Sequence, residues 1–307
     1  MHIEAQIAIT TLCDIFGRSK QAYYQRLSYI YQEEVKNEIL YQEIKRLRKL
    51  MPRIGGRKLY SILKKKFQED FMMGRDKFFD WLRANHLLVR RRRVRIFTTN
   101  SHHWLHKHPY LLEGFTPTGP NQLWVSDITY IETEEGVMYL FLLTDAWSKK
   151  ILGWKLSDNL RAENAIIVLK MALKQWNNRT SELIHHSDRG VQYCSEKYVK
   201  LLENNDIKIS MTQDSNPLDN SIAERVNGIL KDEWIYDKKL ETRRSAINYI
   251  NKIINIYNTI RPHSSLGMHT PNYFHCKASK GEQPKRLWKN YHPKNTKEKE
   301  SCEVAIS

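Results

Sequence analysis

The segments LIHHSDRGVQYCS (residues 183–195) and NPLDNSIAERVNGILKDEW (residues 216–234) decide the fold that we predict for this chain. In the first, an apolar run typical of a strand ends on Asp188. In the second, a Pro/Asn/Asp turn leads into a helical pattern that carries Glu224, with 35 residues between the two acids. Earlier, WVSDITYIE (residues 124–132) places Asp127 in the middle of an alternating strand pattern. Three carboxylates on three elements of a basic chain indicate a divalent-metal site that acts on a polyanion.

The charge of the chain is unevenly distributed. The formal net charge is +16 over 307 residues, and residues 1–110 carry 23 Lys/Arg against 10 Asp/Glu. Residues 121–240 are slightly acidic. Basic flanks around an acidic centre favour nucleic-acid-binding arms joined to a metal-binding core over a generic soluble basic protein. At 41% hydrophobic residues, the chain can form real cores, and wholesale disorder is excluded.

The cysteines and the N-terminal residues indicate the cellular compartment of the protein. Four cysteines are widely scattered without a Cys-x-x-Cys pair, which argues against a zinc ribbon and a disulfide framework. The N-terminal residues lack a basic region followed by a long apolar run, and no segment reaches transmembrane length. We therefore expect a cytoplasmic protein with reduced thiols and no membrane partner.

The first fifty residues are rich in helical patterns. Residues 9–27 predict two short helices with a break at Gly17, the pattern of a helix-turn-helix, and Lys20 and Gln21 point outward as a recognition helix needs. An ordinary corner between two helices is the alternative. Residues 33–50 predict a further, strongly charged helix.

Residues 51–97 predict a second helix-turn-helix-like, DNA-binding segment. Gly55 and Gly56 break the chain before an amphipathic helix, and another follows Gly74. The segment runs into VRRRRVR (residues 89–95), where we interpret Arg91, Arg92 and Arg93 as phosphate contacts; a solvated linker is the alternative. Residues 98–120 are rich in polar residues, His and Pro, and are interpreted as a linker rather than a metal site.

From residue 122 the pattern changes to that of a mixed sheet. Three strands joined by tight turns come first, and a helix, a strand, a helix, a strand and a helix follow. The order predicts an α/β fold with a mixed five-stranded sheet and helices on both faces, over residues 121–275. Residues 276–307 are a basic tail.

The three carboxylates suit two-metal chemistry. Asp127 would bridge both ions, and Asp188 and Glu224 would each bind one. Each also has a structural interpretation: a solvent-facing strand acid, a turn residue and a first-turn helix acid. On spacing alone, Asp145, Asp219 and Glu233 are rivals for any of the three positions.

A resemblance to a known family supports the choice. WVSDITYI, HHSDRGVQY and NPLDNSIAERVNGILKDE resemble the catalytic motifs of DDE transposases and retroviral integrases, which have a ribonuclease H-like fold. Within that superfamily the chain is most similar to the second-frame transposases of the bacterial insertion-sequence family numbered three. YNTIRPHSSLGMHTP resembles the group's closing motif, and the helical residues before the core resemble its helix-turn-helix segment. The resemblance covers roughly residues 40–275.

The resemblance implies roles for individual residues. Asp127, Asp188 and Glu224 would be the catalytic metal ligands, and Lys231 would touch DNA near the cleaved phosphate. The remaining DNA-contact candidates, each with a structural alternative, are Asn220, Asn227, Arg189, Arg261 and His263. The chain departs from the family pattern at Asp214-Ser215 and Leu218, which puts the DNA contacts of that loop in doubt but not the metal ligands.

The sequence thus predicts a DNA transposase that binds terminal inverted repeats and a target. It would cleave and join DNA with two Mg²⁺ ions, for which Mn²⁺ can substitute. The resemblance implies a homodimer or higher multimer, association with the bacterial nucleoid, and a product of an upstream reading frame as a candidate partner. The alternatives are a non-catalytic DNA-binding repressor or relic, and a nuclease of the same fold that does not join strands. A plain ribonuclease H would leave the basic helical arms without a role.

Overall fold

Strand β1 (Leu123–Thr133) is the centre of a five-stranded mixed sheet in the computed structural model, which describes residues 8–71, 73–90, 92, 106–176, 182–212, 221–279 and 281–282. The strand order is β3-β2-β1-β4-β5. Strands β2 (Gly136–Asp145) and β3 (Ile151–Ser157) form an antiparallel meander with β1, and β4 (Ile184–Ser187) and β5 (Lys208–Met211) continue the sheet in parallel. The predicted order of strands and helices and the mixed sheet are confirmed.

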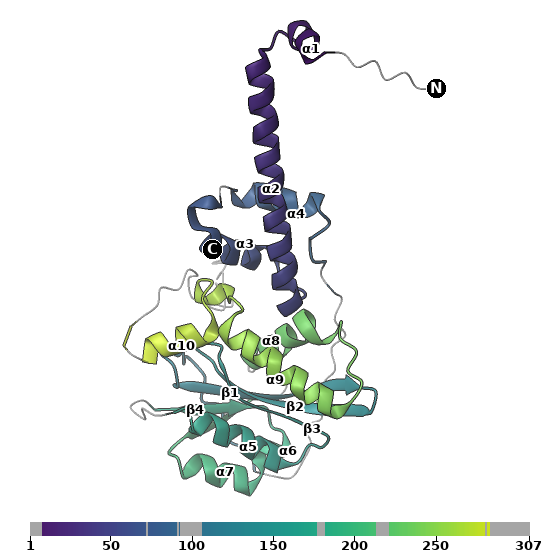
Figure 1. Cartoon of the computed structure of the whole chain (residues 1–307). Helices are drawn as coiled ribbons and strands as arrows, with labels where there is room; N and C mark the ends of the chain where they lie inside the picture. The colour runs from purple at the N-terminus through teal and green to yellow at the C-terminus, as the bar shows by residue number, and fades with distance from the viewer. Residues whose placement is uncertain are drawn as a thin grey trace, which may run out of the picture. The chain divides into compact units, whose positions relative to one another are not determined.

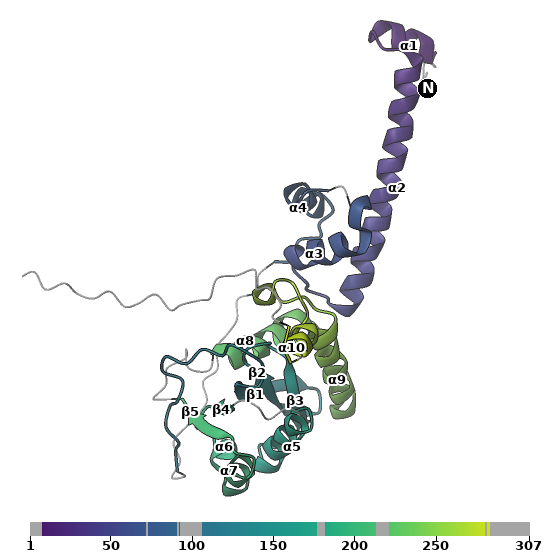
Figure 2. The same ribbon diagram turned by 90° about the vertical axis from the view of Figure 1, so that its left-hand side faces the viewer.

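Helices cover both faces of this sheet (Figures 1 and 2). On one face lie α5 (Ala162–Leu173), the short α6 (Val191–Cys194) and α7 (Glu196–Glu203). On the other lie α8 (Ser221–Leu230) and α9 (Arg243–Thr259). The main core forms between the sheet and the first group, with Trp124, Phe141 and Leu169 fully buried in it.

The side chains of β1 alternate between the two faces of the sheet, one covered by α5 and the other by α8. Trp124 belongs to the core beneath α5, whereas Leu123 and Val125 pack with Ala223 of α8. Successive side chains of a strand point to opposite faces. Asp127 therefore shares the face of Val125, toward α8.

The segment after α8 departs from the α-helix that the pattern predicts through residue 234. The α-helical hydrogen bonding ends at Leu230, and residues Lys231–Ile235 form a π-helical turn, η2. Its side chains Trp234 and Ile235 are buried. After α9, a short 3-10 turn, η3 (Ser264–Leu266), and α10 (Pro271–Ser279) close the described part of the chain.

Residues 54–307 form one compact unit, which includes α3 (Gly56–Phe67), the 3-10 turn η1 (Gln68–Asp70) and α4 (Arg75–Ala84). As predicted, the apolar stripes of the two helices are buried at Leu59, Leu63, Phe78 and Leu82. A Cβ on Gly56 would lie 2.9 Å from the ring of Phe79. The absence of a side chain at Gly56 therefore allows α3 and α4 to approach closely.

Residues 1–53 form the other unit, with α1 (Ile9–Ile15) and α2 (Lys20–Leu50). The predicted break at Gly17 is present: its φ is 60°, the left-handed conformation that glycine adopts without strain. Ser19 caps α2 by accepting a hydrogen bond from Ala22 N–H at 3.1 Å. The prediction of a short second helix ending near residue 27 is wrong: α2 runs unbroken for 31 residues, because no Gly or Pro interrupts it. In the described part of the chain, none of the helices is both long and apolar enough to cross a membrane.

Candidate active site on the central strand

Asp127 is held in place by its neighbours on β1 and α8. Its Oδ1 accepts a hydrogen bond from Ile128 N–H at 2.9 Å, and its Oδ2 accepts one from Asn227 Nδ2 at 2.7 Å. Asn227 is buried on α8, one turn after Glu224. The carboxyl of Asp127 is therefore fixed between its own strand and the helix that carries Glu224.

The charges of the other two predicted acids act on Asp127. Burial, the negative charge of Asp188 and, more weakly, that of Glu224 raise the pKa of Asp127 to about 7, although the hydrogen bonds from Asn227 and Ile128 lower it. Interacting like charges of this kind are characteristic of functional sites. All three carboxylates thus act on one region of the α8 side of the sheet.

Topology explains how Asp188 reaches this region. β4 pairs in parallel with the first residues of β1, and Asp188 directly follows the last residue of β4. Its Oδ1 accepts a hydrogen bond from Gly190 N–H at 3.1 Å. The side chain is half-buried. A carboxyl end of a strand beside the centre of the sheet is a position from which an acid can meet a ligand.

Glu224 lies in the first turn of α8, and its side chain is exposed. Helix α8 packs on β1 through Ala223, which shares a core cluster with Val125. The helix therefore presents Glu224 at the rim of the region around Asp127.

Oxygen donors dominate the region. Asn227 Oδ1 is buried and has no hydrogen-bond partner among the described residues, so a further oxygen stands beside Asp127. Carboxylates and an amide oxygen are the donors that Mg²⁺ and Mn²⁺ prefer. As the side chains stand, however, no three His, Cys, Asp or Glu of the described ranges are gathered as a metal cluster. The donor chemistry fits a hard divalent cation, and binding one would require the three carboxylates to draw together.

The rival acids have other partners. Asp145 is fully buried and accepts hydrogen bonds from Asn121 N–H at 2.7 Å, from Ser148 N–H at 2.7 Å and from Ser148 Oγ at 2.6 Å. Glu233 accepts two hydrogen bonds from Arg261 and one from Lys58. Both carboxylates are saturated by structural contacts. Asp219 lies outside the described residues.

The residues predicted to contact DNA fall into three groups. Lys20 and Gln21 are exposed on α2, and Arg189 is half-buried beside Asp188. Arg261 and His263 are buried, at 2% and 8% exposure, and contact protein. The residues that lie outside the described ranges are Asn220, Arg91 and Arg93.

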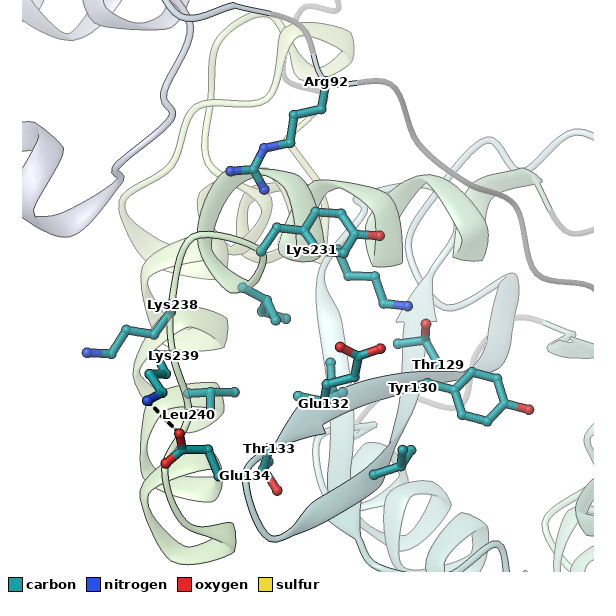
Figure 3. A pocket seen from close by; sticks show the side chains of 14 residues that line it. Arg92, Thr129, Tyr130, Glu132, Thr133, Glu134, Lys231, Lys238, Lys239 and Leu240 are labelled. Atoms are coloured by element: carbon teal, nitrogen blue, oxygen red, sulfur yellow. Dashed lines mark ion pairs between the residues drawn. The ribbon is translucent and has the colours of Figure 1, made fainter.

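Lys231 points from the first residue of η2 toward β1, over Thr129 (Figure 3). Burial lowers the pKa of Lys231, while the charges of Asp127 and Glu132 raise it. The lysine is half-buried, and its charge interacts with that of Asp127. Its contact with DNA remains a prediction.

A basic groove beside this lysine was missed by the sequence analysis. The cavity has a volume of about 890 Å³ and lies between the distal half of β1 and the segment 231–240 (Figure 3). Its charged and aromatic lining residues are Arg92, Tyr130, Glu132, Glu134, Lys231, Tyr236, Lys238 and Lys239. The pair Lys238-Lys239 between two helices was the one local signal for it. We call this cavity the basic groove.

Comparisons with known proteins agree with this fold. Residues 117–217 match one family model described as an integrase core domain, and residues 205–271 match another with the same description. Among solved structures, the chain is similar to a chain of the simian T-cell lymphotropic virus intasome in complex with PP2A regulatory subunit B56 gamma. The TM-score is 0.46 and the identity 16%, covering 85% of this chain and 79% of that one. The strand order of the sheet and the two family matches define a ribonuclease H-like integrase core.

Similar curated proteins narrow the class to a family. The insertion element IS600 uncharacterized 31 kDa protein of Shigella sonnei is 34% identical over 267 residues, covering 86% of this chain and 97% of that protein. Transposase InsF for insertion sequence IS3A of Escherichia coli (strain K12) is 37% identical over 172 residues, 54% of this chain and 58% of that protein. The transposase for insertion sequence element IS904 of Lactococcus lactis is 37% identical over 161 residues, 52% and 63%. The chain belongs to the IS3 family of DDE transposases.

Proposed function

We propose that the chain is a DNA transposase that binds the terminal inverted repeats of its element. It then cleaves one strand and joins the freed 3′-hydroxyl to a target phosphodiester. The observation that carries the proposal is the shared charge environment of Asp127, Asp188 and Glu224, on three elements that meet on one side of the sheet. The named transposases among the relatives support it.

In this proposal Asp127, Asp188 and Glu224 hold two Mg²⁺ ions, and Mn²⁺ can substitute because it prefers the same oxygen ligands. When bound, such ions activate the attacking oxygen and stabilise the leaving oxygen of an in-line displacement. Asn227 orients the Asp127 carboxyl through the hydrogen bond from its Nδ2. Its Oδ1 has no partner among the described residues and can accept a hydrogen bond from a hydrated ligand. Lys231 contacts the phosphate next to the reacting bond.

The helical segments before the core would recognise the DNA ends. In α2, Lys20 and Gln21 are exposed at the start of the helix, where a recognition helix presents its base contacts. Arg91, Arg92 and Arg93 would contact phosphates. Two ends must be brought together for joining, so we propose a homodimer or higher multimer on the nucleoid, with an upstream-frame product as a candidate further subunit.

Substituting the acids tests the active site. Asp127→Asn, Asp188→Asn and Glu224→Gln should each abolish cleavage and joining of labelled element ends in Mg²⁺, while the ends remain bound in a mobility-shift assay. Asp206→Asn is the matched control, because Asp206 is an exposed turn acid before β5, away from the carboxyl end of β4. If one of the three variants still nicks and joins DNA, our assignment of that residue fails.

The same assay separates the alternative functions. A nuclease of this fold would give nicked but never joined products. A repressor or relic would bind the ends without metal-dependent cleavage. The transposase proposal requires joined products from the wild-type chain.

A further inference from the structure

The basic groove lies next to the proposed active site and follows β1 from Thr129, two residues after Asp127. Lys231 lines the groove, and its charge acts on Asp127. The segment from Ile235 to Leu240 forms the opposite wall, and the groove extends past Tyr130 to Thr133 of β1. A ligand in the groove would therefore be continuous with one at the carboxylates.

The floor of the groove is an open strand edge. Ile184 N–H donates to the carbonyl oxygen of Gln122, and Glu134 N–H donates to that of Leu240, so even-numbered residues of β1 present their backbone groups on the β4 side. Pairing with β4 stops at Val125. The N–H groups of Tyr130 and Glu132 therefore face the groove as hydrogen-bond donors.

The charges of the groove favour an anion. Four cationic and two acidic side chains line it. Glu134 is paired with Lys239, with 2.6 Å between Oε1 and Nζ, and Arg92 pairs with Asp237. Lys231 and Lys238 form no ion pair with any described residue. Two lysines are thus free to bind phosphates.

Two aromatic rings stand among these cations. Tyr130 is 44% exposed and Tyr236 is 49% exposed, so a face or an edge of each ring is accessible. The guanidinium of Arg92 lies 5.6 Å from the ring centroid of Tyr236. Accessible aromatic rings in a basic groove are the combination that binds single-stranded nucleic acid, because bases stack on the rings while cations follow the backbone.

We propose that the basic groove binds a short unpaired stretch of the DNA strand that passes the carboxylates, with Lys238 on a phosphate and Tyr236 stacked on a base. This inference rests on the proposed function, because it assumes DNA at the carboxylates. A volume of about 890 Å³ suits nucleotides, since small-ligand sites are roughly 300–1,000 Å³. An extended peptide pairing with the open edge of β1 would use the same backbone donors but has no need of the free lysines.

Equilibrium binding of a labelled oligothymidine to the full chain in Ca²⁺ tests the proposal. Tyr236→Ala should weaken binding at least about fivefold, the effect of losing one stacked base, and Tyr236→Phe should restore it. Lys238→Ala should reduce the slope of log affinity against log salt by about 0.7, the effect of one lost single-strand phosphate contact. Lys170→Ala, an equal charge change on exposed α5 across the sheet, should leave affinity and slope unchanged.

A photo-cross-link locates the bound strand. An oligonucleotide carrying 5-iododeoxyuridine should cross-link to Tyr236 or Tyr130, as identified by mass spectrometry. The proposal is overturned if the Tyr236 and Lys238 variants bind like Lys170→Ala, or if every cross-link lies outside the basic groove. Failure of the proposed function is a separate result, the absence of Mg²⁺-dependent cleavage by the wild-type chain.

Discussion

At the scale of single residues, Asp127 carries a cost to folding. Its carboxylate is half-buried beside two other acids, and its pKa is raised to about 7 against an unfolded value near 3.9. A raised carboxyl pKa means that the folded state holds the proton more tightly, so ionisation penalises folding increasingly from about pH 4 to pH 7 and fully above it. The site is therefore built at the expense of stability.

Asp127→Asn should accordingly stabilise the chain while abolishing its activity. We expect a gain of about 1–3 kcal/mol in the free energy of unfolding at pH 8 in EDTA, and little gain at pH 4. Asn keeps an oxygen that can accept the hydrogen bond from Asn227. Urea denaturation at the two pH values measures the difference. If variant and wild type have equal free energies of unfolding at pH 8, the ionised Asp127 carboxylate does not destabilise the folded chain.

The ion pairs of Glu233 have the opposite effect. Burial raises the pKa of Glu233, but the hydrogen bonds and charges of Arg261 and Lys58 outweigh it, so the net shift is downward. Arg261 binds with two contacts of 2.6 Å, and Lys58 of α3 with one of 2.7 Å. This network joins α3 to η2, the segment after α8.

Removing Arg261 should therefore be severe. Arg261→Ala leaves a buried, partly unpaired carboxylate and should lower the free energy of unfolding by about 3–5 kcal/mol. The Arg261→Ala/Glu233→Gln double variant should be less destabilised than the sum of the two single variants. Urea denaturation measures the free energy of unfolding of each variant. If the changes for the two single variants add up to that of the double variant, Arg261 and Glu233 are not coupled. Because the Glu233 pKa is depressed, the contribution of the pair should fade as the pH drops below about 4.5.

At the scale of elements, the contact between β3 and α5 depends on Gly153. A Cβ at this position would lie 2.3 Å from the carbonyl oxygen of Val168, which no rearrangement of a side chain relieves. Gly153→Ala should therefore lower the free energy of unfolding by at least about 2 kcal/mol through a shift of strand or helix. Gly228→Ala is the matched control: a Cβ there meets nothing within 4 Å, and stability should stay or rise by up to about 1 kcal/mol. Thermal unfolding of both variants decides.

The elements also show what could be predicted from sequence. The strands and helices of the core carry local signals, and their order and mixed pairing agree with the prediction. The sequence pattern was interpreted as one helix ending near residue 27 and another over residues 33–50, but residues 28–32 contain no Gly or Pro, and α2 continues through them. The π-turn at Lys231–Ile235 has no distinct sequence pattern. Its buried Glu233 is set by partners distant in sequence.

The candidate site also has parts that the sequence predicts and parts that it does not. Spacing and resemblance nominate Asp127, Asp188 and Glu224, whose roles remain predictions. Asn227 was predicted as a DNA contact with a structural alternative, and the structure shows it donating a hydrogen bond to Asp127. The basic groove could not be foreseen, because it needs the open edge of β1 and the segment after η2 together. Surfaces formed by distant segments require the tertiary structure.

At the scale of the whole molecule, two buried histidines and Asp127 have opposite effects on the free energy of unfolding as the pH falls. His185 is fully buried, with its Nε2 2.8 Å from Ser126 Oγ and 2.9 Å from Tyr198 Oη, and burial followed by the charge of His186 lowers its pKa to about 3. Burial, then the charge of Arg261, lowers the pKa of His263 to about 2. Both are neutral when folded but protonate near pH 6.5 when unfolded.

Each of these histidines should cost about 1.4 kcal/mol of stability per pH unit below 6.5, because the unfolded state then binds one more proton. As the pH falls from 7 to 4, protonation of Asp127 raises the free energy of unfolding by about the same amount per pH unit. This gain offsets the loss from one histidine. The net loss from the three groups should therefore be about 1.4 kcal/mol per pH unit. Asp127→Asn removes the compensation and should roughly double that slope. Urea denaturation between pH 6.5 and pH 4.5 measures both slopes. A variant profile no steeper than that of the wild type would mean that Asp127 does not hold its proton in the folded chain.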